Sequence, residues 1–387
     1  MKVHRRLLWV GVACALLDVR GGAAPKADAA SFVIAHARVF DGERTLSDTS
    51  VVVENGAIRE VARRAGDQWR KLPSIDGSDD TLLPGLIDAH THTRTVSQLQ
   101  DALRFGVTTV LDMWTPVDEQ ALRQAAASRP DVADLRSSGT LATVPGGHGT
   151  EYGIAIPTVS GPDAAAAFVA ERVANGADYL KIVLNGVRAA TIGAPTMDAP
   201  TARALVNAGQ AHGLLVVAHI ESPDDVRIAV NSGVDGLAHI WRGGDEPDLA
   251  KLVADHHVFV IPTLAVPEGF IPGNGAALAS DPRLKPFLSP EAKRHLDGLD
   301  RTASTPVLPN IDPMIAAVGR LARSGVTLLA GTDPPNGTVV HGASLHRELE
   351  LLVMSGRADA SADRSHEVNG RDLSIDRPRQ DRSRTSR

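Results

Sequence analysis

Two histidines separated by one residue follow the apolar run LLPGLIDA and could bind a metal ion together. His90 and His92 are two residues apart, and side chains at that spacing lie on the same face of an extended strand. Two imidazoles on one face can chelate a divalent ion, because neutral histidine is a common metal ligand. The pair alone is also compatible with ordinary core or loop residues, so other parts of the chain would have to supply further ligands.

Four more polar residues occur in or after later apolar runs, in the order Lys181, His219, His239 and Asp333. Each has an ordinary alternative explanation: a lysine stem that reaches solvent, a histidine satisfied in a loop, or an aspartate that caps a helix. An ammonium in the middle of YLKIVL would, however, be costly to bury without a compensating charge. Taken together, six polar groups at successive run ends predict a divalent metal site.

The elements that would position these residues are eight short apolar runs separated by Ala-rich helical stretches. They cover residues 82–90, 107–113, 134–140, 177–184, 214–220, 234–240, 257–263 and 326–333. Runs with few polar interruptions are typical of strands buried on both faces, and their alternation with helices indicates parallel βαβ units. The sequence therefore predicts an α/β fold, a (β/α)8 TIM barrel over residues 81–356. In such a barrel the reactive groups lie at the carboxyl ends of the strands.

Residues 30–80 have a different pattern, in which apolar and polar residues alternate over 32–40 and 50–63. Asn55-Gly56 lies between two apolar arms, which is a strong signal for a β-hairpin. We expect a small N-terminal β domain ahead of the barrel.

The first 29 residues have the character of a signal peptide. MKVHRR is a positive start, residues 7–17 are apolar, and 27–29 offer a small-x-small cleavage site. An uncleaved anchor and a lipoprotein are the alternatives. The only cysteine, Cys14, lies in this segment, so a metal site in the mature chain must use histidine, carboxylate or modified lysine. We expect an exported protein, periplasmic or secreted.

Composition excludes one class of partner. The 387-residue chain has a net charge of -6 and 3% aromatic residues, so it lacks the basic footprint of a nucleic-acid-binding protein. The expected partner is a small-molecule or short-peptide substrate, with no membrane association once the signal is cleaved. Self-association into a homo-oligomer stays an open alternative.

The motif LPGLIDAHTH resembles the first-strand motif of the metal-dependent amidohydrolase superfamily. The order HxH, Lys, His, His, Asp is similar to its binuclear branch. GADYLKI, AHGLLVVAHI, GLAHI, LLAGTD and SLHRELELL resemble the group that contains imidazolonepropionase-like enzymes, Xaa-Pro dipeptidases and related carboxypeptidases. The resemblance covers residues 32–355 and implies a hydrolase that cleaves an amide C–N bond.

The resemblance divides the six residues between two divalent ions, zinc by default: His90, His92 and Asp333 on the more buried ion, His219 and His239 on the other, and Lys181, as a carbamate, bridging both. A hydroxide bridging the two ions would attack the substrate, and Asp333 would carry its proton to the leaving amine. The alternative is a mononuclear site on His90, His92, His219 and Asp333, with His239 hydrogen-bonded to the substrate and Lys181 unmodified.

Two loops are candidates for substrate contact. Residues 144–153 (VPGGHGTEYG) carry His148 and Tyr152, and glycines there would allow close backbone approach. Asn185 and Arg188, after the fourth run, could contact a substrate carboxylate. The ordinary alternatives are a Gly-rich turn and a solvated loop.

The tail, residues 357–387, is rich in Arg, Asp and Ser without apolar periodicity, which predicts disorder. Similar proteins continue here with segments that complete the N-terminal β domain, so we expect that domain to be incomplete. Our hypothesis is a disrupted reading frame near residue 355 or a truncation. We expect an exported dipeptidase or carboxypeptidase; the alternatives are a cyclic amide or lactone hydrolase, and an unstable, non-catalytic remnant.

Overall fold

The computed structural model describes residues 31–114, 119–185, 194–242, 246–298 and 310–356. The predicted signal peptide, the predicted tail and Arg188 lie outside these residues. Within them, no helix is both long enough and apolar enough to cross a membrane.

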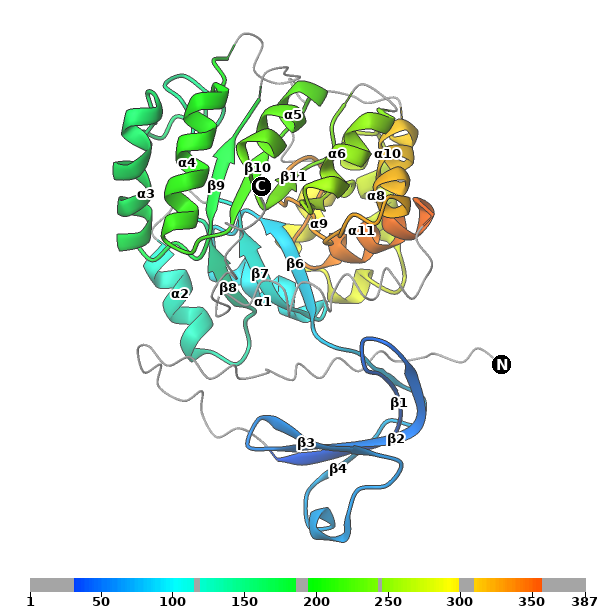
Figure 1. Cartoon of the computed structure of the whole chain (residues 1–387). Helices are drawn as coiled ribbons and strands as arrows, with labels where there is room; N and C mark the ends of the chain where they lie inside the picture. Colours follow the sequence, from blue (N-terminus) through cyan, green and yellow to red (C-terminus); the bar gives the residue numbers. More distant parts are fainter. Residues whose placement is uncertain (1–30, 115–118, 186–193, 243–245, 299–309, 357–387) are drawn as a thin grey trace.

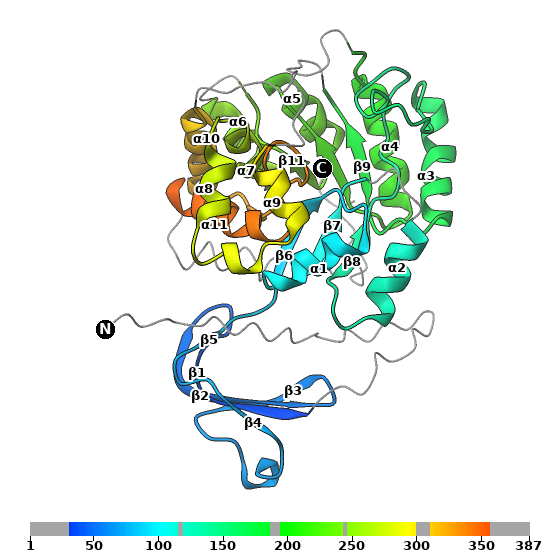
Figure 2. The same ribbon diagram turned by 180° about the vertical axis from the view of Figure 1, so that it is seen from behind.

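The first five strands form one sheet that Figures 1 and 2 show set apart from the helices. Its order is β3-β2-β1-β4, and β5 also pairs with β1. The strands are β1 (Phe32–Phe40), β2 (Thr45–Glu54), β3 (Ala57–Ala62), β4 (Ser74–Asp76) and β5 (Thr81–Leu82). The predicted hairpin is confirmed: β2 and β3 pair antiparallel around Asn55 and Gly56. Their φ angles are 52° and 76°, the left-handed values that a two-residue type I′ turn requires.

Seven parallel strands follow, in two sheets ordered β6-β7-β8 and β12-β11-β10-β9. They are β6 (Leu86–Thr91), β7 (Val107–Asp112), β8 (Asp134–Ser137), β9 (Leu180–Val183), β10 (Val216–His219), β11 (Gly236–Ala238) and β12 (Phe259–Ile261). Helices alternate with them and lie around their outside (Figure 1). These are α1 (Val96–Arg104), α2 (Glu119–Ser128), α3 (Ala165–Ala174), α4 (Ala199–Ala211), α5 (Pro223–Ser232), α6 (Pro247–Asp255), α10 (Asp312–Arg323) and α11 (Ala343–Met354). The arrangement is a TIM-barrel-like α/β fold.

Three short helices lie between β12 and α10 along the chain: α7 (Ala265–Gly269), α8 (Asn274–Ser280) and α9 (Pro290–Leu296). Single 3-10 turns occur at Asp67–Trp69, Pro162–Ala164 and Lys285–Phe287. α7 contacts α11, and the segment leading into α9 contacts α1 through a 2.8 Å hydrogen bond from Ser289 Oγ to Asp101 Oδ2.

The strand expected at residues 82–90 is in fact split between two sheets. β5 ends at Leu82 and pairs with β1, whereas β6 begins at Leu86 and pairs with β7. Pro84 lies between them and has no N–H to donate to a ladder. A Cβ on Gly85 would lie 2.3 Å from Thr108 Oγ1, so the chain passes β7 too closely for a side chain.

The last expected strand, residues 326–333, forms only an isolated bridge to β12. It still lies between β12 and β6, because its backbone hydrogen-bonds to both. The amides of Thr332 and Asp333 both donate to the carbonyl oxygen of His90. Two residues therefore oppose one, as in a β-bulge, and a regular ladder does not form.

An apolar cluster fills the space between the strands, with members from five strands and from the 326–333 segment. It contains Ala89, Leu111, Met113, Tyr179, Val217, Ala238, Ile261 and Leu329. Lys181 and His219 come two residues after Tyr179 and Val217, so their side chains point to the same interior. The polar residues thus lie above this cluster, toward the carboxyl ends of the strands.

Candidate metal centre

A bulge in β6 directs His90 into the interior. Asp88 pairs with Val110 and Thr91 with Asp112, so β6 advances by three residues where β7 advances by two. An extra residue of this kind bends a strand and re-aims its side chains. As a result Ala89 joins the interior apolar cluster, and the next side chain, His90, also reaches the site.

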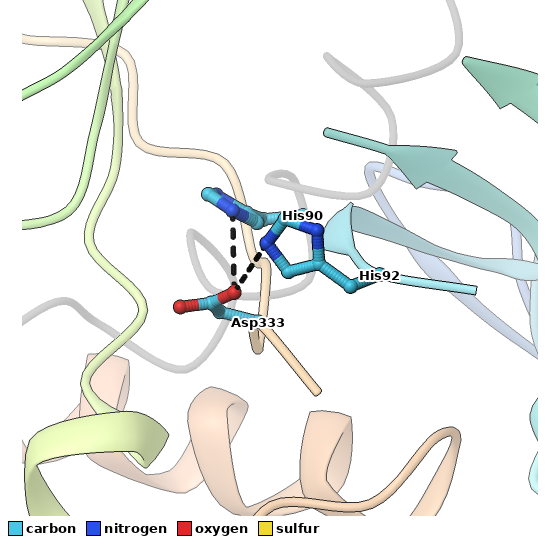
Figure 3. Close-up of side chains that lie close together, drawn as sticks. All are labelled: His90, His92 and Asp333. Carbon is cyan, nitrogen blue, oxygen red and sulfur yellow. Dashed lines mark ion pairs between the residues drawn. The ribbon is translucent and has the colours of Figure 1, made fainter. Parts of the chain in front are cut away.

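The two histidines of the first motif meet the last aspartate. His90 Nε2 lies 3.4 Å, and His92 Nε2 3.0 Å, from Oδ1 of Asp333. Figure 3 shows both rings turned toward this carboxylate. One ligand atom from each residue falls within 4.8 Å of the others, so the three residues could hold a metal ion.

The other three expected ligands adjoin this group. Lys181 Nζ lies 3.3 Å from His90 Nε2. His239 places Nδ1 3.9 Å from Asp333 Oδ2 and Nε2 3.0 Å from His219 Nδ1. All six residues named from the sequence therefore form one continuous cluster.

Neighbouring strand ends orient two of the rings. The carbonyl oxygen of Trp114, beyond β7, contacts Nδ1 of His92. Thr263 Oγ1, beyond β12, lies 2.7 Å from Nδ1 of His239. Such partners on the second ring nitrogen fix the orientation in which a histidine presents its other nitrogen to a metal.

Backbone strain is concentrated around the cluster. Four non-glycine residues here have φ in the left-handed region: Trp114, His239, Thr263 and Asp333. Such conformations are unfavourable and tend to occur at functional sites, where surrounding contacts hold them.

Asp88 is a further buried partner of the site, which the spacing of the histidines did not reveal. Its Oδ1 accepts hydrogen bonds from the amides of Thr332, at 2.9 Å, and His90, at 3.2 Å. Asp88 therefore ties β6 to the segment that carries Asp333. Burial raises its pKa to about 7. The available signal was a carboxylate inside the apolar run LIDAH, where an unpartnered charge would be costly.

The charge states favour metal binding. Burial lowers the pKa of His90 and His219 well below the ordinary value and that of His239 to about 3, so these rings are neutral at pH 7. Burial also lowers the pKa of Lys181 to about 8. Burial alone would raise the pKa of Asp333, but its hydrogen bond with His92 and the nearby charges bring it below the ordinary value.

The atoms that face one another test whether the residues fit a metal. His90 Nε2 and His92 Nε2 both approach Asp333 Oδ1, and His219 Nδ1 faces His239 Nε2. Clustered neutral imidazoles and a carboxylate are also the donor set that zinc prefers. The residues therefore fit a divalent ion.

Two residues that we expected to contact the substrate lie beside the cluster. The ring centroids of His148 and His219 are 4.9 Å apart, and those of Tyr152 and Trp114 are 5.5 Å apart. Tyr152 is 49% exposed, so it is accessible at the edge of the cluster. Asn185 is buried, with Oδ1 unpartnered within the described part of the chain.

A sequence model of the amidohydrolase family matches residues 81–367. A curated relative, an uncharacterized protein from Mycobacterium tuberculosis, is 25% identical over 274 residues; the match covers 67% of this chain and 66% of the relative. The fold is shared with a candidate prolidase from Bifidobacterium longum, with TM-score 0.68, 24% identity, and coverage of 90% of this chain and 84% of that one. It is also shared with a Xaa-Pro dipeptidase crystallised with methionine in its active site, with TM-score 0.66, 20% identity and coverage of 89% and 88%.

Proposed function

The chain belongs to the amidohydrolase family, hydrolytic enzymes that act on carbon–nitrogen bonds, and we propose that it cleaves the amide bond of a short peptide or N-acyl amino acid. The observation that carries the proposal is the cluster of four imidazoles and a buried lysine around the Asp333 carboxylate. Similarity of fold to a candidate prolidase and a Xaa-Pro dipeptidase favours a dipeptidase or carboxypeptidase within this class.

We propose that the cluster holds two divalent ions, zinc by default: one at His90, His92 and Asp333, and a second at His219 and His239, with carbamylated Lys181 between them. Two atoms bound tetrahedrally to one zinc ion are about 3.3 Å apart, given bond lengths near 2.0–2.1 Å. The two distances from Asp333 Oδ1, 3.4 Å to His90 Nε2 and 3.0 Å to His92 Nε2, are consistent with this. When bound, the ions activate water and polarise the scissile carbonyl.

Asp333 is the proposed proton carrier. Its Oδ1 is contacted by both histidines of the first motif and by Asn336 Nδ2 at 2.9 Å. Oδ2 is approached by His239 Nδ1 at the longer distance of 3.9 Å. A lowered pKa keeps the carboxylate ionised at neutral pH. Oδ2 is therefore the atom that takes the proton of the attacking water and passes it to the leaving amine.

Further parts of the proposal concern the rest of the chain. His148, Tyr152 and Arg188 contact the substrate, and residues 1–29 direct export. The segment 81–356 closes into an eight-stranded barrel, which the bridges from Ala142 to Ile182 and from Val260 to Leu328 support. Residues 30–80 form a small β domain ahead of the barrel.

The test is metal analysis of the purified full-length protein, combined with a screen of dipeptides, N-acyl amino acids, cyclic amides and lactones. About two ions per chain and hydrolysis of linear amides support the proposal. Hydrolysis of cyclic amides or lactones alone would replace it with that activity. Folded protein that binds no metal and cleaves none of these compounds would refute the proposal and support the alternative of a non-catalytic remnant.

A further inference from the structure

Two adjacent residues of α11 hold α7. Arg347 makes a double ion pair with Glu268, with Nε 2.8 Å from one carboxylate oxygen and Nη2 2.7 Å from the other. The next residue, Glu348, is completely buried, and its Oε2 accepts a 2.7 Å hydrogen bond from the backbone N–H of Ala265. Ala265 is the first residue of α7, so Glu348 fixes the point at which this helix begins.

The start of α7 is only two residues from a contact to the candidate metal centre. β12 ends at Ile261, and Thr263 follows, with its Oγ1 2.7 Å from Nδ1 of His239. Thr263 is buried and has a φ of 51°, which a β-branched residue rarely adopts. Such a conformation persists only where surrounding contacts hold it, and the anchored start of α7 is one such contact.

We propose that Glu348 is a positioning residue for His239. Glu348 accepts the hydrogen bond from the Ala265 N–H and thereby fixes the turn at Thr263. The hydroxyl of Thr263 in turn orients the imidazole of His239. A completely buried glutamate is otherwise unfavourable beside apolar neighbours. The metal-binding role of His239 rests on the proposed function, whereas the orientation of its ring does not.

Matched variants separate the effect of the length of the Glu348 side chain from the effect of its charge. Glu348→Asp keeps the carboxyl group but withdraws it by one methylene from Ala265. Glu348→Gln keeps an acceptor oxygen at the original length; since burial raises the pKa of Glu348 to about 8, glutamine is also close to the form present at pH 7. Glu291→Asp is the control, because Glu291 is an exposed glutamate of α9 and is not one of the residues that hold α7.

The first measurement uses metal-free, full-length protein with ¹⁵N-labelled histidine rings. The signal of His239 is identified as the one absent from His239→Gln. We expect Glu348→Asp to shift that signal, and Glu348→Gln and Glu291→Asp to leave it in place. An unchanged signal in Glu348→Asp, or an equal shift in Glu348→Gln, would overturn the proposal.

The second measurement is Zn²⁺ titration of the same proteins. Outer partners of metal-binding histidines typically affect affinity by 10- to 100-fold. We expect Glu348→Asp to weaken one of two sites by about tenfold, and Glu348→Gln to restore it; equal affinities in all variants would count against the proposal. If the wild type binds no zinc, the proposed function fails, while the ring signal still decides the role of Glu348.

Discussion

Asp333 Oδ1 lies 3.0 Å from His92 Nε2, which joins the end of β6 to the end of the last expected strand, residues 326–333. Asp88 reinforces this junction, because its Oδ1 accepts hydrogen bonds from the amide of His90 on one segment and the amide of Thr332 on the other. The carboxylate that we propose as proton carrier is therefore held by the two chain segments that it links.

Replacing Asp333 by asparagine should remove the proton carrier while keeping the shape of the side chain. We expect kcat to fall roughly 100- to 10,000-fold, the usual range for general acid–base groups, with little change in the free energy of unfolding. Steady-state kinetics and urea unfolding measure the two. Asp248→Asn, at an exposed residue of α6, is the control. Activity near the wild-type level would rule out the assigned role.

His219 separates the two-ion site from the mononuclear alternative. Its Nδ1 faces His239 rather than the group formed by His90, His92 and Asp333. His219→Asn should therefore lower the metal content from about two ions to about one per chain, measured by elemental analysis after dialysis. A wild type with one ion, lost in this variant, would instead support the mononuclear site.

Lys181 should carry a carbamate when metal is bound. We expect the native mass of the chain to include one CO₂ that is released on acidification. Lys181→Met should lose this mass together with most of the bound metal, because the bridging ligand is gone. Lys251→Met is the control, since Lys251 is an exposed lysine paired with Asp255. Wild-type protein with two ions and no CO₂ would contradict the modification.

Tyr152 should affect substrate binding more than chemistry. Tyr152 is half exposed beside Trp114 and lies outside the candidate metal centre. We expect Tyr152→Ala to raise KM about tenfold with kcat nearly unchanged, which is the pattern for loss of uniform binding. Ile154→Ala, at an exposed residue of the same region, should leave KM near the wild-type value. A tenfold fall in kcat at constant KM would contradict this role.

The raised pKa of Glu348 predicts that the stability of the fold depends on pH. Its pKa in the folded chain, about 8, is above the ordinary value of 4.5. Between pH 4.5 and pH 8 the folded chain therefore retains a proton that the unfolded chain has lost. Its contribution to stability is complete below pH 4.5 and is lost as pH rises through 8. The total loss is roughly 3–5 kcal/mol at about 1.4 kcal/mol per pH unit.

Urea unfolding from pH 5 to pH 9 measures this effect as the difference between wild type and Glu348→Gln. The free energy of unfolding should fall more steeply with pH in the wild type, since glutamine does not titrate. Glu350→Gln should follow the wild-type slope. Parallel curves for wild type and Glu348→Gln would mean that the pKa of Glu348 is not raised.

Local sequence patterns were sufficient for a large part of this molecule. Seven of the eight apolar runs contain a parallel strand of the structure, and Asn55-Gly56 predicted the hairpin, because both signals depend on neighbouring residues. The order of His, Lys and Asp residues also indicated which side chains come together in the candidate metal centre, since the carboxyl ends of barrel strands meet on one side.

Only the tertiary structure decided how those residues are held. The split of the 82–90 run depends on the close passage of Gly85 against Thr108, and the partners Asp88, Thr263 and Glu348 act across strands and helices. Hydrogen bonds between distant segments leave no periodic signal in a sequence, because their partners are set by packing rather than by spacing along the chain. The sequence by itself therefore determined which residues form the candidate centre, and the folded chain determined which neighbours orient them.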